Sequence, residues 1–190
     1  MKLLATLALS AVLALPAGAA IVHDEGSNGD ISTNENAPTP MVFAIGENRV
    51  IGSVRNGGTP PDPRDYLTFT VPDGHMLAPL NLIAFAPNNI AFAAFNAGNT
   101  SWIPDFATDP NFLSGIHVNV SEIGLDLMGQ FVCCNVTSNA LPGPFLGPGT
   151  YTFLMQQANN ITTTYTLDFV LQAAVPTDAS TWGALKQLYR

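Results

Sequence analysis

The chain has 190 residues, of which 47% are hydrophobic and 11% charged, enough apolar material for the core of one domain. Its formal net charge is −8 at pH 7. A negative field of this size repels phosphate backbones, so the composition argues against nucleic acid as a partner.

Residues 1–20 have the layout of a secretory signal peptide. Lys2 precedes an apolar run from Leu3 to Leu15, and the small residues 17–19 follow it. The run is shorter than the roughly 20 apolar residues that a membrane-spanning helix needs. We therefore expect an exported protein, secreted or at the cell surface, whose mature chain has no transmembrane span.

Beyond residue 20, apolar and polar side chains alternate with the period of two that is typical of half-buried β-strands. The alternation predicts strands at 67–71, 151–155 and 165–171, and further apolar runs predict strands at 41–45, 49–54, 77–85, 90–96 and 124–128. Gly and Pro clusters mark the turns between them. About eight short strands predict an all-β fold over residues 21–174, an antiparallel β-sandwich of jelly-roll type.

Two regions break this pattern. Residues 99–116, NTSWIPDFATDPNFLSGI, predict a long loop over the sandwich or a short helical turn, and residues 141–149 predict a Pro/Gly linker. Asp105 and Asp109 in the first region could be imagined as a glycosidase carboxylate pair, but solvation of a loop explains them more simply. The chain has no paired zinc-ligand histidines and no G-x-S-x-G motif, so we expect no catalysis.

The two cysteines, Cys133 and Cys134, are adjacent. Cα atoms of linked cysteines usually lie about 4.4–6.8 Å apart, whereas consecutive Cα atoms are about 3.8 Å apart. Three interpretations stay open: a vicinal disulfide, a pair that crosslinks two chains, and two buried thiols on a strand after Phe131.

Residues 175–190, VPTDASTWGALKQLYR, predict a short amphipathic C-terminal helix. The residues of its apolar face would be Trp182, Leu185, and Leu188 or Tyr189. A helix of about 10 residues is marginal alone in water, so it should dock on something. Its beginning resembles that of bacterial PEP-CTERM sorting tails, without their hydrophobic span. We expect it either to pack on the sandwich or to dock to a partner or to sorting machinery.

The stretch DYLTFTVPDGHML, residues 65–77, is similar to the D-Y-F-x-F-x-V-P-x-G-x-x-L core of bacterial pre-peptidase C-terminal domains. These domains are secreted β-sandwich modules found beside proteases and in cell-surface proteins. The stretches EGSNGDIS, NAPTP and IGENRVIGS resemble the segment before that core, and GPGTYTFLMQQ and TTYTLDFVL resemble the last two strands. The resemblance covers residues 23–173.

This resemblance implies a calcium site. In calcium-binding members, an acidic segment that contains Asn meets the Asp just before the D-Y-F strand. Glu25, Asn28 and Asp30 match that segment, Asp65 matches the Asp, and Asp62 is a possible partner, although Pro63 stands where the family commonly has another Asp. Ca²⁺ takes about 6–8 oxygen ligands, which carboxylates and an Asn carbonyl supply. The alternative is that Asp65 caps a turn and Asp30 lies in a solvated loop.

The resemblance also implies a non-catalytic module that binds or adheres to cell-surface glycan, matrix or another protein, with Ca²⁺ fixing its amino-terminal segment. One alternative is a structural component of an envelope or extracellular matrix, and another is a small secreted hydrolase. A shared fold does not decide between these functions.

Overall fold

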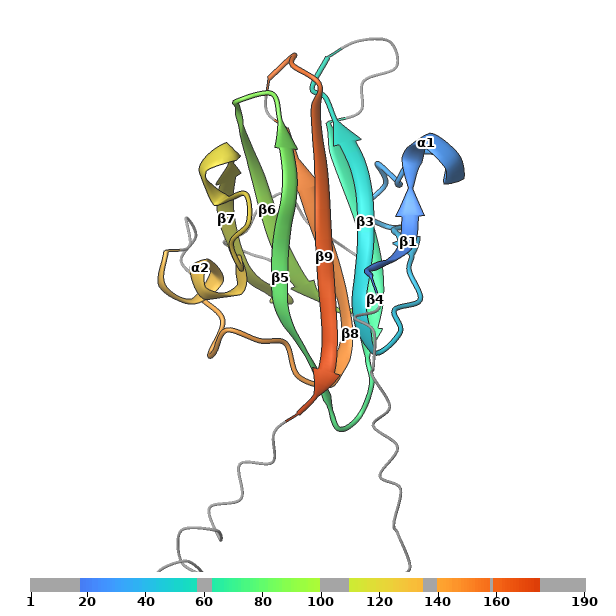
Figure 1. Cartoon of the computed structure of the whole chain (residues 1–190), viewed down its shortest axis with the longest axis vertical. Coiled ribbons are helices and arrows are strands. Elements are labelled where there is room, and N and C mark those ends of the chain that lie inside the picture. Colours follow the sequence, from blue (N-terminus) through green and yellow to red (C-terminus); the bar gives the residue numbers. More distant parts are fainter. Residues whose placement is uncertain (1–17, 58–62, 100–109, 135–139, 158, 175–190) are drawn as a thin grey trace, which may run out of the picture.

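A computed structural model describes residues 18–57, 63–99, 110–134, 140–157 and 159–174. Within these residues the protein is a sandwich of two β-sheets, one with four strands and one with five (Figure 1). The expected all-β sandwich is therefore confirmed. No helix in these ranges combines the length and the apolar character that a membrane crossing requires.

The first sheet has the strand order β1-β3-β9-β5 and the second has the order β2-β4-β8-β6-β7. The strands of the first sheet are β1 (Ala20–Asp24), β3 (Gly46–Val54), β9 (Thr163–Ala173) and β5 (His75–Ala86). Those of the second are β2 (Thr39–Pro40), β4 (Arg64–Val71), β8 (Gly149–Gln156), β6 (Ile90–Ala97) and β7 (Phe112–Asn119).

Most neighbouring strands are antiparallel, with β3 paired along its length to β9 and β4 to β8. Two pairs are parallel: β1 with β3, and β2 with β4. A four-residue helix, α1 (Glu25–Asn28), follows β1 directly. The amino-terminal segment therefore forms the same edge of both sheets, β1 in one and β2 in the other.

The core lies between the sheets and is rich in aromatic rings. Phe153 of β8 meets Phe169 of β9 edge to face, with ring centroids 5.3 Å apart, and Phe95 of β6 lies 5.1 Å from Phe153. All three side chains are fully buried. The alternation read from the sequence places them there, because side chains at every second position of a strand share one face.

The opposite edge of the sandwich is covered by the chain between β7 and β8. It contains a 3₁₀ turn, η1 (Val120–Glu122), and a short helix, α2 (Met128–Cys133). Asp126 anchors this segment on β5, because one of its carboxylate oxygens accepts hydrogen bonds from the amides of Leu80 and Met128 at 3.0 and 2.9 Å. Leu127 and Met128 are buried as a result.

Three expectations about individual elements were wrong. Residues 41–45 are not a strand, because pairing in this segment stops at Pro40 after two residues. Residues 124–128 make a single bridge, Asn81 with Asp126; Met128 begins α2, and the remaining residues form turns and bends. Phe112 to Ile116, expected in a loop, belong to β7. Residues 100–109, with Trp102, and the expected tail helix at 175–190 lie outside the described residues.

Candidate metal centre

Three carboxylates from separate segments meet at the edge formed by β1, β3 and β4. Glu25 is the first residue of α1, Asp30 lies in the loop that follows this helix, and Asp65 is the second residue of β4. One ligand oxygen from each carboxylate lies within 4.8 Å of the other two. Carboxylates this close repel one another unless a cation or a proton lies among them.

Glu25 is held on both of its oxygens. The amide of Ile31 donates to Oε1 at 3.2 Å, and the hydroxyl of Ser53, on β3, donates to Oε2 at 3.0 Å. Burial raises the pKa of Glu25 above its ordinary value, the two hydrogen bonds lower it, and the charge of Asp30 raises it. The balance is a raised pKa, because burial outweighs the hydrogen bonds, so ionised Glu25 is less favourable in the folded metal-free protein than in the unfolded chain.

The loop that carries Asp30 is fixed at several points. A ring nitrogen of His23 lies 2.9 Å from the carbonyl oxygen of Gly29. Two residues after Asp30, the carbonyl of Ser32 accepts a hydrogen bond from the amide of Tyr66 at 2.8 Å, and the amide of Ser32 donates to the hydroxyl of Thr39. The bond to Tyr66 attaches the loop directly beside Asp65.

Asp65 is a buried strand residue. It has the same parity as Leu67 and Phe69, so it points between the sheets, and its exposed fraction is 0%. The hydroxyl of Tyr165, which comes across from β9, donates to its Oδ2 at 2.6 Å. Gly52 of β3 leaves the room for that hydroxyl, because a Cβ atom at position 52 would overlap the end of the Tyr165 ring.

Of the five residues that the sequence suggested as ligands, Glu25, Asp30 and Asp65 come together. Asn28 is exposed, and its carbonyl oxygen accepts a hydrogen bond from the amide of Asp24 at 2.9 Å, so it closes the turn of α1 instead. Asp62 lies outside the described residues. The alternative in which Asp65 caps a turn is wrong, since this residue lies within β4, but its second part holds, since Asp30 lies exposed in a loop.

The donor set suits a hard cation. Three carboxylates offer up to six oxygens, of which three accept hydrogen bonds: both oxygens of Glu25, from Ile31 and Ser53, and Oδ2 of Asp65, from Tyr165. Ca²⁺ prefers carboxylate and carbonyl oxygens and completes its shell of about 6–8 ligands with water. Ser53, Tyr165 and Gly52, which orient the cluster or leave space around it, were not expected from the sequence. They lie on β3 and β9 and belong to no recognisable motif.

Cys133 and Cys134 form a vicinal disulfide at the end of α2. Both residues are exposed. The interpretation as two buried thiols on a strand is therefore wrong, because this part of the chain is helical and the pair lies at the surface.

Comparison with known proteins adds no relative to these observations: no family model matches the chain, and a search of curated proteins finds no similar sequence.

Proposed function

We propose that the protein is an exported, non-catalytic β-sandwich module that binds to a cell-surface glycan or protein and uses Ca²⁺ to fix its amino-terminal segment. The observation that carries the calcium part is the meeting of Glu25, Asp30 and Asp65 within 4.8 Å. An ion there would add a second link between the loop after α1 and the start of β4, beside the hydrogen bond from the Tyr66 amide to the Ser32 carbonyl.

Two further features support parts of this proposal. The signal-like residues 1–20 and the disulfide at Cys133 and Cys134 agree with export, because disulfides persist in oxidising compartments. The resemblance of residues 65–77 to pre-peptidase C-terminal domains supports a role at the cell surface. Neither feature identifies the ligand.

Calcium binding is tested by titrating the metal-free protein with Ca²⁺ in a calorimeter and by comparing its thermal midpoint with and without chelator. At a calcium concentration 100 times the Kd, binding to the folded state alone adds about 2.7 kcal/mol to the free energy of unfolding. Asp65→Asn removes a ligand charge from the cluster and should abolish both the heat and the stabilisation.

Asp73→Asn is the matched control, because it removes the same charge from an exposed turn and should leave calcium binding unchanged. Equal binding by the Asp65→Asn protein, or no binding by the unsubstituted protein, would remove Ca²⁺ from the proposal.

The binding role needs a separate experiment. Labelled protein is added to whole cells, with soluble polysaccharides as competitors, and the same preparation is measured by sedimentation. Saturable binding that a polysaccharide displaces supports recognition of a glycan, and saturable binding without such competition supports a protein ligand. Absence of saturable binding together with concentration-dependent assembly would replace the proposal with a structural role in an envelope or matrix.

A further inference from the structure

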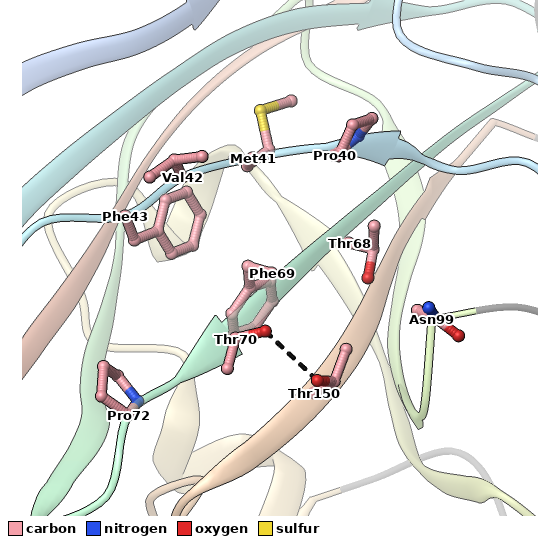
Figure 2. A pocket seen from close by; sticks show the side chains of 10 residues that line it. All are labelled: Pro40, Met41, Val42, Phe43, Thr68, Phe69, Thr70, Pro72, Asn99 and Thr150. Atoms are coloured by element: carbon pink, nitrogen blue, oxygen red, sulfur yellow. Dashed lines mark hydrogen bonds between the residues drawn. The ribbon is translucent and has the colours of Figure 1, made fainter.

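A groove runs along the edge of the sandwich beside β4, lined by apolar side chains and by the polar residues Thr68, Thr70, Asn99 and Thr150. Figure 2 shows Val42 and Phe43 along one wall, Phe69 on the other, and Pro72 at the end of β4. The volume of the groove is about 420 Å³. Val42 is 88% exposed, more than any other large hydrophobic residue that the structure describes, and a neighbouring hollow connects it to Ile21, which is 62% exposed. Apolar surface gathered in this way marks a place where something docks.

The wall that carries Val42 has a fixed shape. Pairing with β4 ends at Pro40, and the chain then passes outward over the core with Phe43 stacked on Phe69 at 4.9 Å. The buried side chain of Asn48 holds the end of this segment, because it accepts a hydrogen bond from the amide of Ala44 and donates one to its carbonyl, both at 2.8 Å. The exposure of Val42 is therefore built into the fold.

The described part of the chain ends beside this groove. The amide of Ala174 donates to the carbonyl of Gly74 at 2.8 Å, and Gly74 is two residues beyond Pro72, which lines the groove. Phe69 lies five residues before Gly74, so at most about 18 Å of chain separates them. The seven residues between Ala174 and Trp182 reach about 25 Å when extended, enough to bring Trp182 to the groove.

Residues 175–190 have the chemistry to fill it. They carry apolar side chains at helical spacing, among them Trp182 and Leu185, and a helix of this length needs a surface to stabilise it. None of the residues that line the groove is charged, so apolar contact would hold this segment there. The covalent connection favours this occupant over a separate molecule, because tethering gives an effective concentration in the millimolar range.

We propose that residues 175–190 fold back along the sandwich and place Trp182 and its apolar neighbours in the groove beside Val42. The same face would then be unavailable to any other partner until the tail is displaced. The chain's own carboxyl-terminal segment is thus a built-in competitor for this docking surface.

Tryptophan fluorescence tests this directly, because the chain has only two tryptophans and Trp102→Phe leaves Trp182 as the sole reporter. We expect acrylamide to quench Trp182 several-fold less in this protein than in a synthetic peptide of residues 175–190. Adding Val42→Asp should raise the quenching constant to that of the peptide. Ile90→Asp is the control, since Ile90 is 56% exposed at the start of β6, away from the groove, and the constant should not change.

Three results would overturn the proposal. The first is quenching of Trp182 as strong as in the peptide while Val42 is unchanged, and the second is an unchanged quenching constant in the Val42→Asp protein. The third is protection of Trp182 from acrylamide that disappears on dilution, because a second copy of the chain would then be the occupant. If Trp102→Phe does not fold, hydrogen exchange replaces it. The amides of Val42, Phe43 and Ile45 should then exchange faster in a chain that ends at Ala174 than in the full chain, and equal exchange rates would refute the proposal.

Discussion

Replacing Tyr165 by Phe removes one hydrogen bond from a buried carboxylate and leaves the aromatic ring in place. The Tyr165 hydroxyl donates to Oδ2 of Asp65 at 2.6 Å, and the exposed fractions of the two residues are 1% and 0%. A hydrogen bond to a charged group contributes about 1.5–3 kcal/mol, and water cannot replace the lost donor at this depth. We expect Tyr165→Phe to lower the free energy of unfolding of the metal-free protein by about 2 kcal/mol.

Gly52→Ala tests the same contact from the other side. The new Cβ would overlap the Tyr165 hydroxyl and lie 3.0 Å from Cε1, so the ring must move away from Asp65. Overpacking lowers the free energy of unfolding by about 1–3 kcal/mol and the lost hydrogen bond lowers it by about 1.5–3 kcal/mol. The lower conformational entropy of the unfolded Gly52→Ala chain raises it by about 0.4–1 kcal/mol. A net loss of about 3–4 kcal/mol is expected.

Urea unfolding of both variants and of the double variant separates these contributions. Because both substitutions break the same hydrogen bond, the double variant should be less destabilised than the sum of the single variants by about 1.5–3 kcal/mol. Strict additivity, or a loss below about 0.5 kcal/mol for Tyr165→Phe, would show that this hydrogen bond does not stabilise the fold as argued.

Burial raises the pKa of Glu25 above 4.5, so the folded metal-free protein binds the proton of the Glu25 carboxyl group more tightly than the unfolded chain does. The free energy of unfolding should therefore fall as pH rises from 4.5 through the raised pKa. Glu25→Gln should remove this decline from urea midpoints measured across that range, and a decline of equal size in the variant would contradict the assignment. Arg49 pairs with Asp168 through two hydrogen bonds of 2.8 and 2.7 Å, and the Asp168 side chain is 4% exposed against 31% for Arg49. Arg49→Ala should therefore cost about 3 kcal/mol in chemical denaturation, more than Asp168→Ala, because it leaves the more buried charge unpaired; the reverse order would refute this. Reduction of Cys133 and Cys134 should change the free energy of unfolding by about 1 kcal/mol or less, because adjacent cysteines close almost no loop in the unfolded chain. A larger loss of stability in guanidinium unfolding with dithiothreitol would show that the disulfide stabilises the fold by something other than loop closure.

Where one face of a strand is buried along its length, the sequence was sufficient to predict the strand. Leu67, Phe69 and Val71 alternate with threonines, and β4 contains all three with their side chains in the core. The strand β7 was missed because Ser114 and Gly115 interrupt its apolar pattern. Ser114 is nevertheless buried, since its hydroxyl donates to the carbonyl of Phe131 at 2.8 Å. A tertiary contact of this kind has no local signal.

The predictions of strands at residues 41–45 and 124–128 were wrong for a different reason. The apolar side chains of these segments do serve the core, since Met41, Leu127 and Met128 are buried. Their backbones make only isolated hydrogen bonds to neighbouring strands, at Thr68 of β4 and at Leu80 and Leu82 of β5. The hydrophobic pattern indicates which side chains are buried, whereas a strand also needs a continuous ladder of backbone hydrogen bonds.

The candidate site was predictable only in its acidic residues. The parity of Asp65 with Leu67 already indicates a carboxylate that faces the core. Nothing local indicates that Ser53 reaches Glu25 or that Tyr165 reaches Asp65, because these contacts depend on how the two sheets and α1 come together. Asn28 was suggested by its residue type, but its place in the turn of α1 directs its carbonyl oxygen to Asp24.

The strand pairing has a consequence for when this chain can fold. The early strand β3 pairs with β9, and β4 pairs with β8, so both sheets are centred on strands from the last quarter of the described chain. Neither sheet can assemble until those residues have been synthesised, and contacts between distant parts of a sequence form slowly. Until then the parallel strands β1 and β2 have no completed sheet to join, because their partners β3 and β4 are themselves held by β9 and β8.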